Sequence, residues 1–454
     1  MRLNDKFTII IIGDIILAIC AVYAGYGMRF VTDAAEGISH VRLIQLPFFV
    51  TGVLFSSFLV ELYDGTKVIT VWDRIVRINI GLVLSFVLLS ALYYLVHAFS
   101  IGRGSFFISL GFFGFGQFTW HTLYEMVINS AGLGRKVLVL GTGKLAEQIG
   151  GIITATNHNH VLRGYIDCAR ESVVVPQQSI VGNGNTLFDV IQKEKPQKIV
   201  VSLTERRGVL PVRDILACKM SGIEVVDAPS FYEELTGKLL LEDLRPSWLI
   251  FNEGFRITPV VRLYKRCFDV GIAMLALFII LPLMPIVALM IKLDSKGPVF
   301  FKQERLGERE QPFTLIKFRT MREDAESETG PVWAQKNDLR ITRIGRILRK
   351  TRLDEFPQLI NVLKGDMSFI GPRPERREFI DKLKEVIPFY SERHFIKPGI
   401  TGWAQIKYPY GASVQDAIEK LKFDLYYIKN LSPLLDLMIV TETIKVVLFG
   451  RGGR

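Results

Sequence analysis

Apolar residues gather into long runs at the N-terminal end of the chain. Four such runs cover about residues 7–28, 43–62, 78–98 and 105–128, and each is close to the roughly 20 residues that a membrane-spanning helix needs. Polar and charged residues fall mainly between the runs. The pattern predicts a bundle of four transmembrane helices over residues 1–130.

One carboxylate, Asp14, interrupts the first apolar run. An ionisable residue inside a membrane span is a functional-site hypothesis by default. A hydrogen bond between helices, or a partner for a basic group, is the favoured interpretation here.

From residue 131 to 250 the pattern changes to short apolar runs that alternate with amphipathic stretches. Runs at 136–140, 198–203 and 223–227 predict buried strands, and such alternation is typical of a parallel, Rossmann-like α/β sheet. The first run leads into G-T-G-K-L-A (141–146), a turn that lets backbone N–H groups approach a phosphate. Asp167 follows this turn at about the sequence spacing expected for a residue that contacts a ribose. Nucleotide binding and a regulatory or scaffolding role both remain open for this domain.

A fifth apolar run lies at 270–291, within a segment at 260–292 that has basic residues at both ends. Pro282 and Pro285 stand near its middle, and proline breaks or kinks a helix. A straight span would also export the basic segment that follows. The pattern favours a re-entrant membrane helix, and an ordinary fifth span is the alternative. Residues 293–454 form a last domain, which ends in an amphipathic stretch at 436–449 suited to lie on the membrane.

The charge of the chain agrees with a membrane location. With 56 basic and 45 acidic residues its net charge is +11, which suits anionic lipid head groups or phosphate substrates. Basic residues are not interleaved with exposed aromatic ones, so we expect no nucleic-acid partner. Four cysteines stand far apart, which argues against disulfides and zinc. Basic residues at the N-terminus (Arg2, Lys6) and in the second loop (Lys67, Arg74, Arg77) predict that both ends of the bundle, and all that follows, are cytoplasmic.

The candidate chemistry lies in the last domain. A run of cations between Arg340 and Arg352 ends in R-L-D-E-F-P-Q (352–358), which holds the adjacent carboxylates Asp354 and Glu355. Positive neighbours favour the ionised form of a carboxylate, so we expect both to stay charged. Ionised carboxylates hold Mg²⁺ or attack phosphorus to form an acyl phosphate. A charged helix start with local salt bridges explains the motif equally well when it is taken alone.

Three further basic turns shift the balance toward phosphoryl transfer. They are K-F-R-T-M (317–321), I-G-P-R-P-E (370–375) and K-P-G-I-T-G-W-A-Q (397–405), and arginine suits bidentate phosphate contact. The chain has no P-loop, no H-E-x-x-H, no G-x-S-x-G and no D-x-D. These absences disfavour P-loop nucleotide-binding proteins, H-E-x-x-H zinc proteases, G-x-S-x-G serine hydrolases and metal-dependent glycosyltransferases that use a D-x-D motif.

Together these motifs resemble the polyprenyl-phosphate sugar-1-phosphate transferases of bacteria with a re-entrant membrane helix. In particular the chain is similar to the large members, which carry four N-terminal spans and a Rossmann-like domain. The resemblance is densest at K-R-C-F-D (265–269), at F-K-Q-E-R-L-G (301–307), through the motifs above, and at D-L-Y-Y (424–427). The implied fold class is a membrane α-helical bundle, an α/β Rossmann-like domain and a re-entrant-helix α/β catalytic domain.

The resemblance also implies roles for individual residues. Asp354 would be the nucleophile that displaces UMP, and Glu355 would support it and help to hold Mg²⁺. Phosphates or the nucleotide would be bound by Lys317, Arg319, Arg349 and Arg373, with acidic support from Asp424. The re-entrant helix would be pinned at head-group level by Lys265, Arg266 and Asp269 and broken at Pro282, here without the serine that usually precedes this proline.

The implied reaction moves a sugar-1-phosphate from a UDP-sugar to undecaprenyl phosphate, with release of UMP, at the cytoplasmic side of the bacterial inner membrane. It would begin the synthesis of an exopolysaccharide or another surface polysaccharide. The stretch 406–410 departs from the Asn-Gly-Arg of many relatives, which leaves the sugar open, and a homo-oligomer is also left open. A membrane-anchored sugar-nucleotide epimerase or dehydratase and a non-enzymatic assembly scaffold are the alternatives. No Tyr-x-x-x-Lys stands in residues 131–250, which disfavours the first of these.

Overall fold

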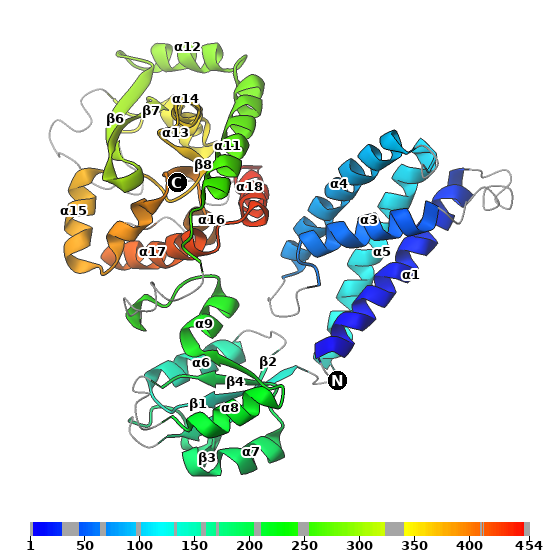
Figure 1. Ribbon diagram of the computed structural model, residues 1–454. Coiled ribbons are helices and arrows are strands. Elements are labelled where there is room, and N and C mark those ends of the chain that lie inside the picture. The colour runs from blue at the N-terminus through cyan, green and yellow to red at the C-terminus, as the bar shows by residue number, and fades with distance from the viewer. Residues whose placement is uncertain are drawn as a thin grey trace. The chain divides into compact units, whose positions relative to one another are not determined.

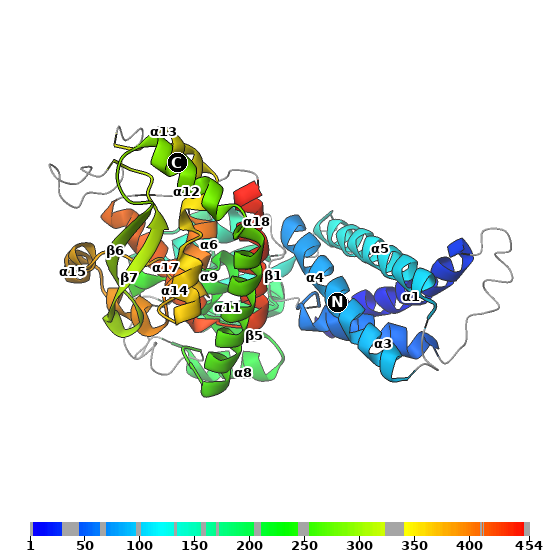
Figure 2. The same ribbon diagram turned by 90° about the horizontal axis from the view of Figure 1, so that it is seen from above.

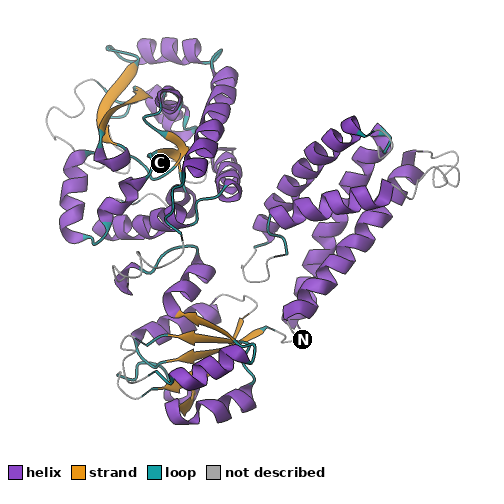
Figure 3. Cartoon of the chain, viewed as in Figure 1, coloured by secondary structure: helices purple, strands orange, loops and turns teal. Residues whose placement is uncertain are grey.

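The protein is mostly helical, and its chain divides into two compact units, Met1–Thr236 and Gly237–Arg454. The computed structural model describes residues 3–29, 45–63, 70–96, 101–130, 134–155, 160–168, 172–203, 210–243, 254–322, 340–408, 411 and 413–448. Arg2 and Lys67, two of the basic residues predicted to face the cytoplasm, residues 409–410 of the stretch 406–410, and residue 449 at the end of the predicted amphipathic stretch lie outside the described residues. Figure 3 shows how helices and strands are distributed along the chain.

The four N-terminal apolar runs all form helices, α1 (Leu3–Arg29), α3 (Gln45–Leu59), α4 (Val71–Leu95) and α5 (Arg103–Ser130). Helix α1 packs against α3 and α5, and α4 packs against the same two. Gly25 and Gly114 allow this packing, since a Cβ on either would overlap the side chain of Ser109 or Leu82. Within the described residues, Thr8–Arg29 and Val71–Leu95 are long and apolar enough to cross a membrane, and α3 is a shorter apolar helix.

Residues 135–236 form a five-stranded parallel sheet with helices on both faces (Figure 1). Its strands are β1 (Arg135–Leu140), β2 (His160–Asp167), β3 (Ile180–Asn183), β4 (Lys198–Val201) and β5 (Glu224–Asp227), in the order β3-β2-β1-β4-β5. Helices α6 (Lys144–Ala155) and α9 (Ala228–Thr236) cover one face, and α7 (Leu187–Glu194) and α8 (Val212–Met220) cover the other. This is the order of doubly wound nucleotide-binding sheets, and it confirms the predicted parallel sheet.

The glycine turn predicted after the first strand lies between β1 and α6. Gly141 has a φ of +125°, which a residue with a side chain rarely adopts. The Thr142 hydroxyl donates to Asp167 Oδ1 across 3.4 Å, so the turn and the end of β2 are in contact.

The C-terminal unit begins with a broken apolar helix. Helix α11 (Pro259–Ile280) ends one residue before Leu281–Pro282, and α12 (Met284–Asp294) continues at an angle of 63°. The predicted break is therefore confirmed, and the angle is visible in two views (Figures 1 and 2). Large apolar side chains stay exposed around the bend, among them Met274, Leu275, Phe278, Ile279, Leu281, Ile286 and Leu289. A surface of this kind marks a membrane or protein contact.

The rest of the unit is built from short elements around an apolar core. An antiparallel hairpin, β6 (Phe300–Leu306) and β7 (Pro312–Phe318), precedes α13 (Arg343–Lys350), the turn η6 (Leu353–Glu355) and α14 (Gln358–Lys364). A parallel pair, β8 (Ser368–Ile370) and β9 (Gly399–Thr401), brackets α15 (Arg377–Val386) and η7 (Tyr390–Phe395). The unit ends with α16 (Trp403–Lys407), α17 (Val414–Lys429) and α18 (Pro433–Leu448).

Both arms of the broken helix pack on this core. Ala273 of α11 packs with Leu359 and Val362 of α14, whereas Val287 and Ile291 of α12 pack with Leu348 of α13. The two arms thus leave from and return to the same unit.

Candidate active site

A sharp turn places the two adjacent carboxylates inside the C-terminal unit. Helix α13 starts at the cap residue Thr342, and Arg352 adopts a left-handed conformation with a φ of +59° two residues after the helix ends. The chain then enters the single 3₁₀ turn η6, which buries both Asp354 and Glu355. An unusual backbone conformation of this kind often occurs at functional sites.

Glu355 is the centre of a cluster of cations. Its Oε1 accepts hydrogen bonds from Arg373 Nη2 at 2.8 Å and from Lys317 Nζ at 3.3 Å, and Arg352 Nη1 lies 3.7 Å away. Burial alone would raise its pKa, but Arg373, Lys317 and Arg352 together hold that pKa well below the usual range. Glu355 therefore stays ionised and fixes three basic side chains.

Asp354 has the opposite environment. Its Oδ1 is buried and accepts no hydrogen bond from any residue that the structure describes. Burial, with repulsion from Glu355, raises the pKa of Asp354 to about 6, against the attraction of Lys317, Arg349 and Arg373. The sequence predicts that both carboxylates stay ionised, and the structure adds that their pKa values lie far apart. Such a separation is characteristic of paired carboxylates with different chemical roles.

The basic side chains named in the sequence analysis reach this site unequally. Lys317 extends from β7, and burial lowers its pKa against the attraction of Glu355. Arg349, in the last turn of α13, donates from Nε to Thr320 Oγ1 at 2.9 Å. Arg319 lies beyond the end of β7, and its Nη2 binds the carbonyl and hydroxyl oxygens of Ser295 at 2.8 and 3.0 Å. The structure thus brings Lys317, Arg349 and Arg373 to the carboxylates, but turns Arg319 toward the end of α12.

Asp424 is buried in α17 and is paired with Arg393, a residue that the sequence analysis missed. Arg393 Nη2 donates to Asp424 Oδ2 at 2.9 Å and to the carbonyl oxygen of Arg373 at 3.1 Å. Burial raises the pKa of Asp424 to about 6 despite the nearby Arg393. Asp424 therefore contacts the site through Arg393. Nothing in the local sequence around Arg393 distinguishes it from other basic residues.

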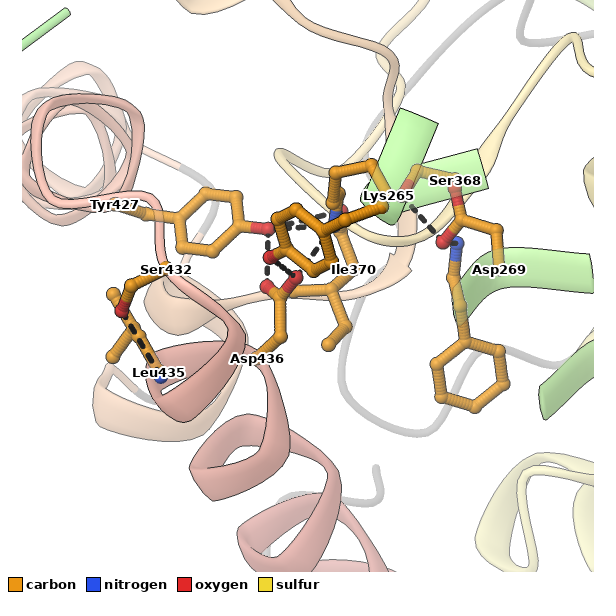
Figure 4. Close-up of polar contacts among 10 residues, drawn as sticks. Lys265, Asp269, Ser368, Ile370, Tyr427, Ser432, Leu435 and Asp436 are labelled. Carbon is orange, nitrogen blue, oxygen red and sulfur yellow. Dashed lines mark hydrogen bonds and ion pairs between the residues drawn. The ribbon is translucent and has the colours of Figure 1, made fainter. Parts of the chain in front are cut away.

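The residues predicted to pin the broken helix bind protein groups in the structure (Figure 4). Lys265 Nζ donates to the carbonyl oxygen of Ile370 at 3.0 Å and to Tyr427 Oη at 2.8 Å. Asp269 accepts from Ser368 Oγ and from the Phe369 backbone N–H, each at 2.8 Å. Lys265 and Asp269 thus hold β8, the strand that leads into the Arg373 segment.

Two further contacts complete the attachment of α11. Arg266 donates to the last carbonyls of α14, Val362 at 2.6 Å and Leu363 at 2.7 Å. Lys265 also lies 3.2 Å from Asp436, a buried residue of α18 that accepts a hydrogen bond of 2.6 Å from Tyr427 Oη. The base of the broken helix is therefore joined to α14, β8 and α18, and Pro282 lies at its far end.

A divalent cation fits part of this arrangement. Within the described part of the chain, Asp354 Oδ1 is a buried oxygen without a hydrogen-bond partner, which a metal ion would satisfy. Oε1 of Glu355 already serves three cations, so its contribution as a ligand would be smaller. Among the described residues no group of three or more His, Cys, Asp and Glu side chains surrounds a metal position. Mg²⁺ commonly binds through one or two carboxylates together with substrate phosphates, and Asp354 and Glu355 are the carboxylates that would hold it here.

Comparison with known proteins connects this geometry to a family. Residues 260–450 match the family model described as bacterial sugar transferase. The chain is 43% identical over 242 residues to a UDP-N-acetylgalactosamine-undecaprenyl-phosphate N-acetylgalactosaminephosphotransferase of Aeromonas hydrophila, covering 53% of this chain and 56% of the relative. It is 33% identical over 328 residues to an undecaprenyl-phosphate glucose phosphotransferase of Komagataeibacter xylinus, covering 70% of this chain and 60% of the relative.

A shorter relative is matched over most of its length. The exopolysaccharide production protein PSS of Rhizobium leguminosarum bv. phaseoli is 43% identical over 185 residues, which is 40% of this chain and 92% of that protein. The chain thus spans a little over half of the two longer relatives and nearly all of the shorter one.

Proposed function

The chain belongs to the bacterial sugar transferase family, and we propose that it transfers a sugar-1-phosphate from a UDP-sugar to undecaprenyl phosphate with release of UMP. The observation that carries the proposal is the buried Asp354 Oδ1, which has no hydrogen-bond partner among the described residues and lies near the cations Lys317, Arg349 and Arg373. The relatives named as phosphotransferases act on the same class of lipid acceptor. The product would start an exopolysaccharide or a related surface polymer, in line with the name of the shorter relative.

In the first step, one carboxylate oxygen of Asp354 attacks the β-phosphorus of the UDP-sugar. The bond between this phosphorus and the bridging oxygen breaks, and UMP leaves with the electron pair. Asp354 then carries the phosphosugar as an acyl phosphate. The raised pKa of Asp354 matches this role, since a carboxylate with few hydrogen bonds is a better nucleophile than one held as Glu355 is.

In the second step, a phosphate oxygen of the lipid attacks the same phosphorus. The acyl–phosphate bond breaks, Asp354 is regenerated, and the sugar is left on a lipid diphosphate. Lys317 and Arg349 offset the negative charge that develops on the phosphoryl oxygens in both steps, and Arg373 binds the diphosphate of the nucleotide sugar in the first. Mg²⁺ held by Asp354, with help from Glu355, would neutralise part of the diphosphate charge of the substrate.

The same proposal includes a place in the membrane. Because both arms of the α11–α12 pair pack on one unit, a helix that enters one leaflet and returns fits better than a crossing span. The catalytic domain, residues 293–454, would then lie at the cytoplasmic face of the bacterial inner membrane, at the depth of a lipid phosphate. The helices of residues 1–130 would anchor the chain, and the sheet of residues 131–250 would form a separate domain.

The proposal is tested by measuring UMP release across a panel of UDP-sugars with undecaprenyl phosphate. We expect release from at least one UDP-sugar, and a phosphosugar adduct on the peptide that contains Asp354 when the lipid is left out. UMP release without any trapped adduct would reject the covalent step, and no release from any donor would reject the activity.

A further inference from the structure

The segment that carries Arg373 is held in place through its carbonyl oxygens. Pro372 and Pro374 flank this arginine and have no N–H to donate. The Pro372 carbonyl accepts from the Gly399 backbone N–H at 2.9 Å, and the Pro374 carbonyl lies 3.4 Å from Arg305 Nη1. Because residues 372–374 have few backbone N–H groups of their own, hydrogen-bond donors from other segments must hold them in place.

Arg393 provides that contact for Arg373 itself. Its Nη2 donates to the Arg373 carbonyl at 3.1 Å, and the same nitrogen binds Asp424 Oδ2 at 2.9 Å. Its Nη1 donates to Tyr390 Oη at 2.7 Å, and its guanidinium lies 5.2 Å from the centre of the Tyr390 ring. Tyr390 and Asp424 thus hold the Arg393 guanidinium in the position from which it contacts Arg373.

Burial gives this contact its rigidity. Arg393 is 6% exposed and Asp424 is 3% exposed. A buried ion pair gains little stability over apolar residues of similar size, because removing two charges from water costs about as much as their attraction returns. A gain in stability is therefore a weak explanation for a buried Arg393–Asp424 pair next to Arg373.

We propose that Arg393, held by Asp424, is a positioning residue that fixes the Arg373 guanidinium for the diphosphate of the nucleotide sugar. The inference rests on the proposed function and deepens it, because it assigns Asp424 to positioning instead of substrate contact. The connection runs from Asp424 through Arg393 to the backbone of Arg373, and from the Arg373 side chain to Glu355, 2.8 Å away.

The inference predicts a selective kinetic effect. A small displacement of a substrate-positioning group costs up to about 100-fold in rate. Arg373 would act on the nucleotide sugar, so its displacement should raise the KM for the UDP-sugar. The KM for undecaprenyl phosphate should stay unchanged, whereas a general loss of structure would impair both half-reactions.

The experiment replaces the whole pair by apolar residues. Arg393→Met combined with Asp424→Leu removes both charges together and so avoids leaving one of them buried alone. We expect kcat/KM for the UDP-sugar to fall about 10- to 100-fold, with no more than about a twofold change in the KM for the lipid. The milder Asp424→Asn, which keeps an acceptor for Arg393, should shift the same parameter less. The control is Glu419→Gln, which breaks the pairing of Glu419 with Lys238 and Lys422 on the same helix α17 and should leave both KM values unchanged.

A double-mutant cycle with Arg373→Ala distinguishes positioning from a merely structural role. If Arg393 acts through Arg373, the paired substitution should have less than about a twofold effect once Arg373 is gone. Additive effects, or equal losses in both half-reactions, would overturn the inference while the activity of the unmodified chain stands. Absence of UMP release from the unmodified chain would instead reject the proposed function, and the inference with it.

Discussion

Two buried carboxylates, one in each unit, show how differently a protein can use the same group. Asp14 of α1 accepts hydrogen bonds from Tyr63 Oη at 2.7 Å and from Gln117 Nε2 at 2.6 Å, and His121 Nε2 lies 3.1 Å away. Its contacts join α1 to α5 and to the end of α3. Asp354, by contrast, has a buried Oδ1 that accepts no hydrogen bond from the residues described in the structure.

The difference lies in the neighbours. Asp14 is surrounded by hydrogen-bond donors that satisfy it completely, so its contribution is to fix helix packing. Asp354 is surrounded by cations that bind mainly to Glu355, so one of its own oxygens stays available. A satisfied buried carboxylate is structural, whereas one with an unsatisfied oxygen implies a ligand or a reaction.

The largest expected effect is the loss of activity in Asp354→Asn. An amide cannot form the acyl phosphate, so UMP release should fall by more than about a thousandfold, as when a nucleophile is removed from other covalent enzymes. The measurement is a UMP-release assay, with Asp14→Asn as the matched control that should stay within about twofold of the unmodified chain. Near-normal turnover in Asp354→Asn would exclude this residue as the nucleophile.

Removal of divalent metal comes next. Chelation with EDTA should lower UMP release by at least about a hundredfold, since the diphosphate charge would no longer be neutralised. Activity should return on addition of Mg²⁺. Full activity in EDTA would show that the cations of the site suffice without a metal ion.

The pH profile should show the raised pKa of Asp354. Because the nucleophile must be ionised, the rate should drop about tenfold per pH unit below the pKa of about 6 and level off above it. The folding stability changes with pH in the opposite direction. Because the folded state binds this proton more tightly than the unfolded chain, the free energy of unfolding falls as pH rises from about 4 to 6. A rate that stays constant down to pH 5 would contradict the raised pKa.

The smallest effect concerns Asp14. Asp14→Ala removes a buried acceptor shared by Tyr63, Gln117 and His121, at a cost of about 1–3 kcal/mol of stability. Thermal unfolding followed by circular dichroism should therefore shift to lower temperature, with UMP release per folded molecule unchanged. In the same measurement Asp354→Asn should not lower the unfolding temperature, because it removes a buried charge. If Asp14→Ala lost activity but not stability, Asp14 would have a functional role and not the structural role assigned here.

Much of the architecture was predictable because it depends on local sequence. The four apolar runs form α1, α3, α4 and α5, and the break falls at Pro282, where proline prevents a continuous helix. The three predicted strands are β1, β4 and β5 of a parallel sheet. The order of motifs from 265 to 427 indicated the family that the comparisons confirm.

The details of the site were less predictable. Lys317 and Arg319 stand in one motif, yet β7 ends at Phe318, so the two side chains reach different partners. Lys265 and Asp269 were expected at lipid head groups, and in the structure they hold β8. Their role in the membrane, like the other assigned roles, stays a prediction.

The sequence by itself determined where the chain is apolar, where its helices break and which chemical groups are present, because these properties belong to single residues and their neighbours. Only the tertiary structure decided that Glu355 takes the cations while Asp354 keeps an unsatisfied oxygen, and that Arg393 connects Asp424 to Arg373. Burial and charge proximity arise when distant segments pack together, and a pKa depends on both.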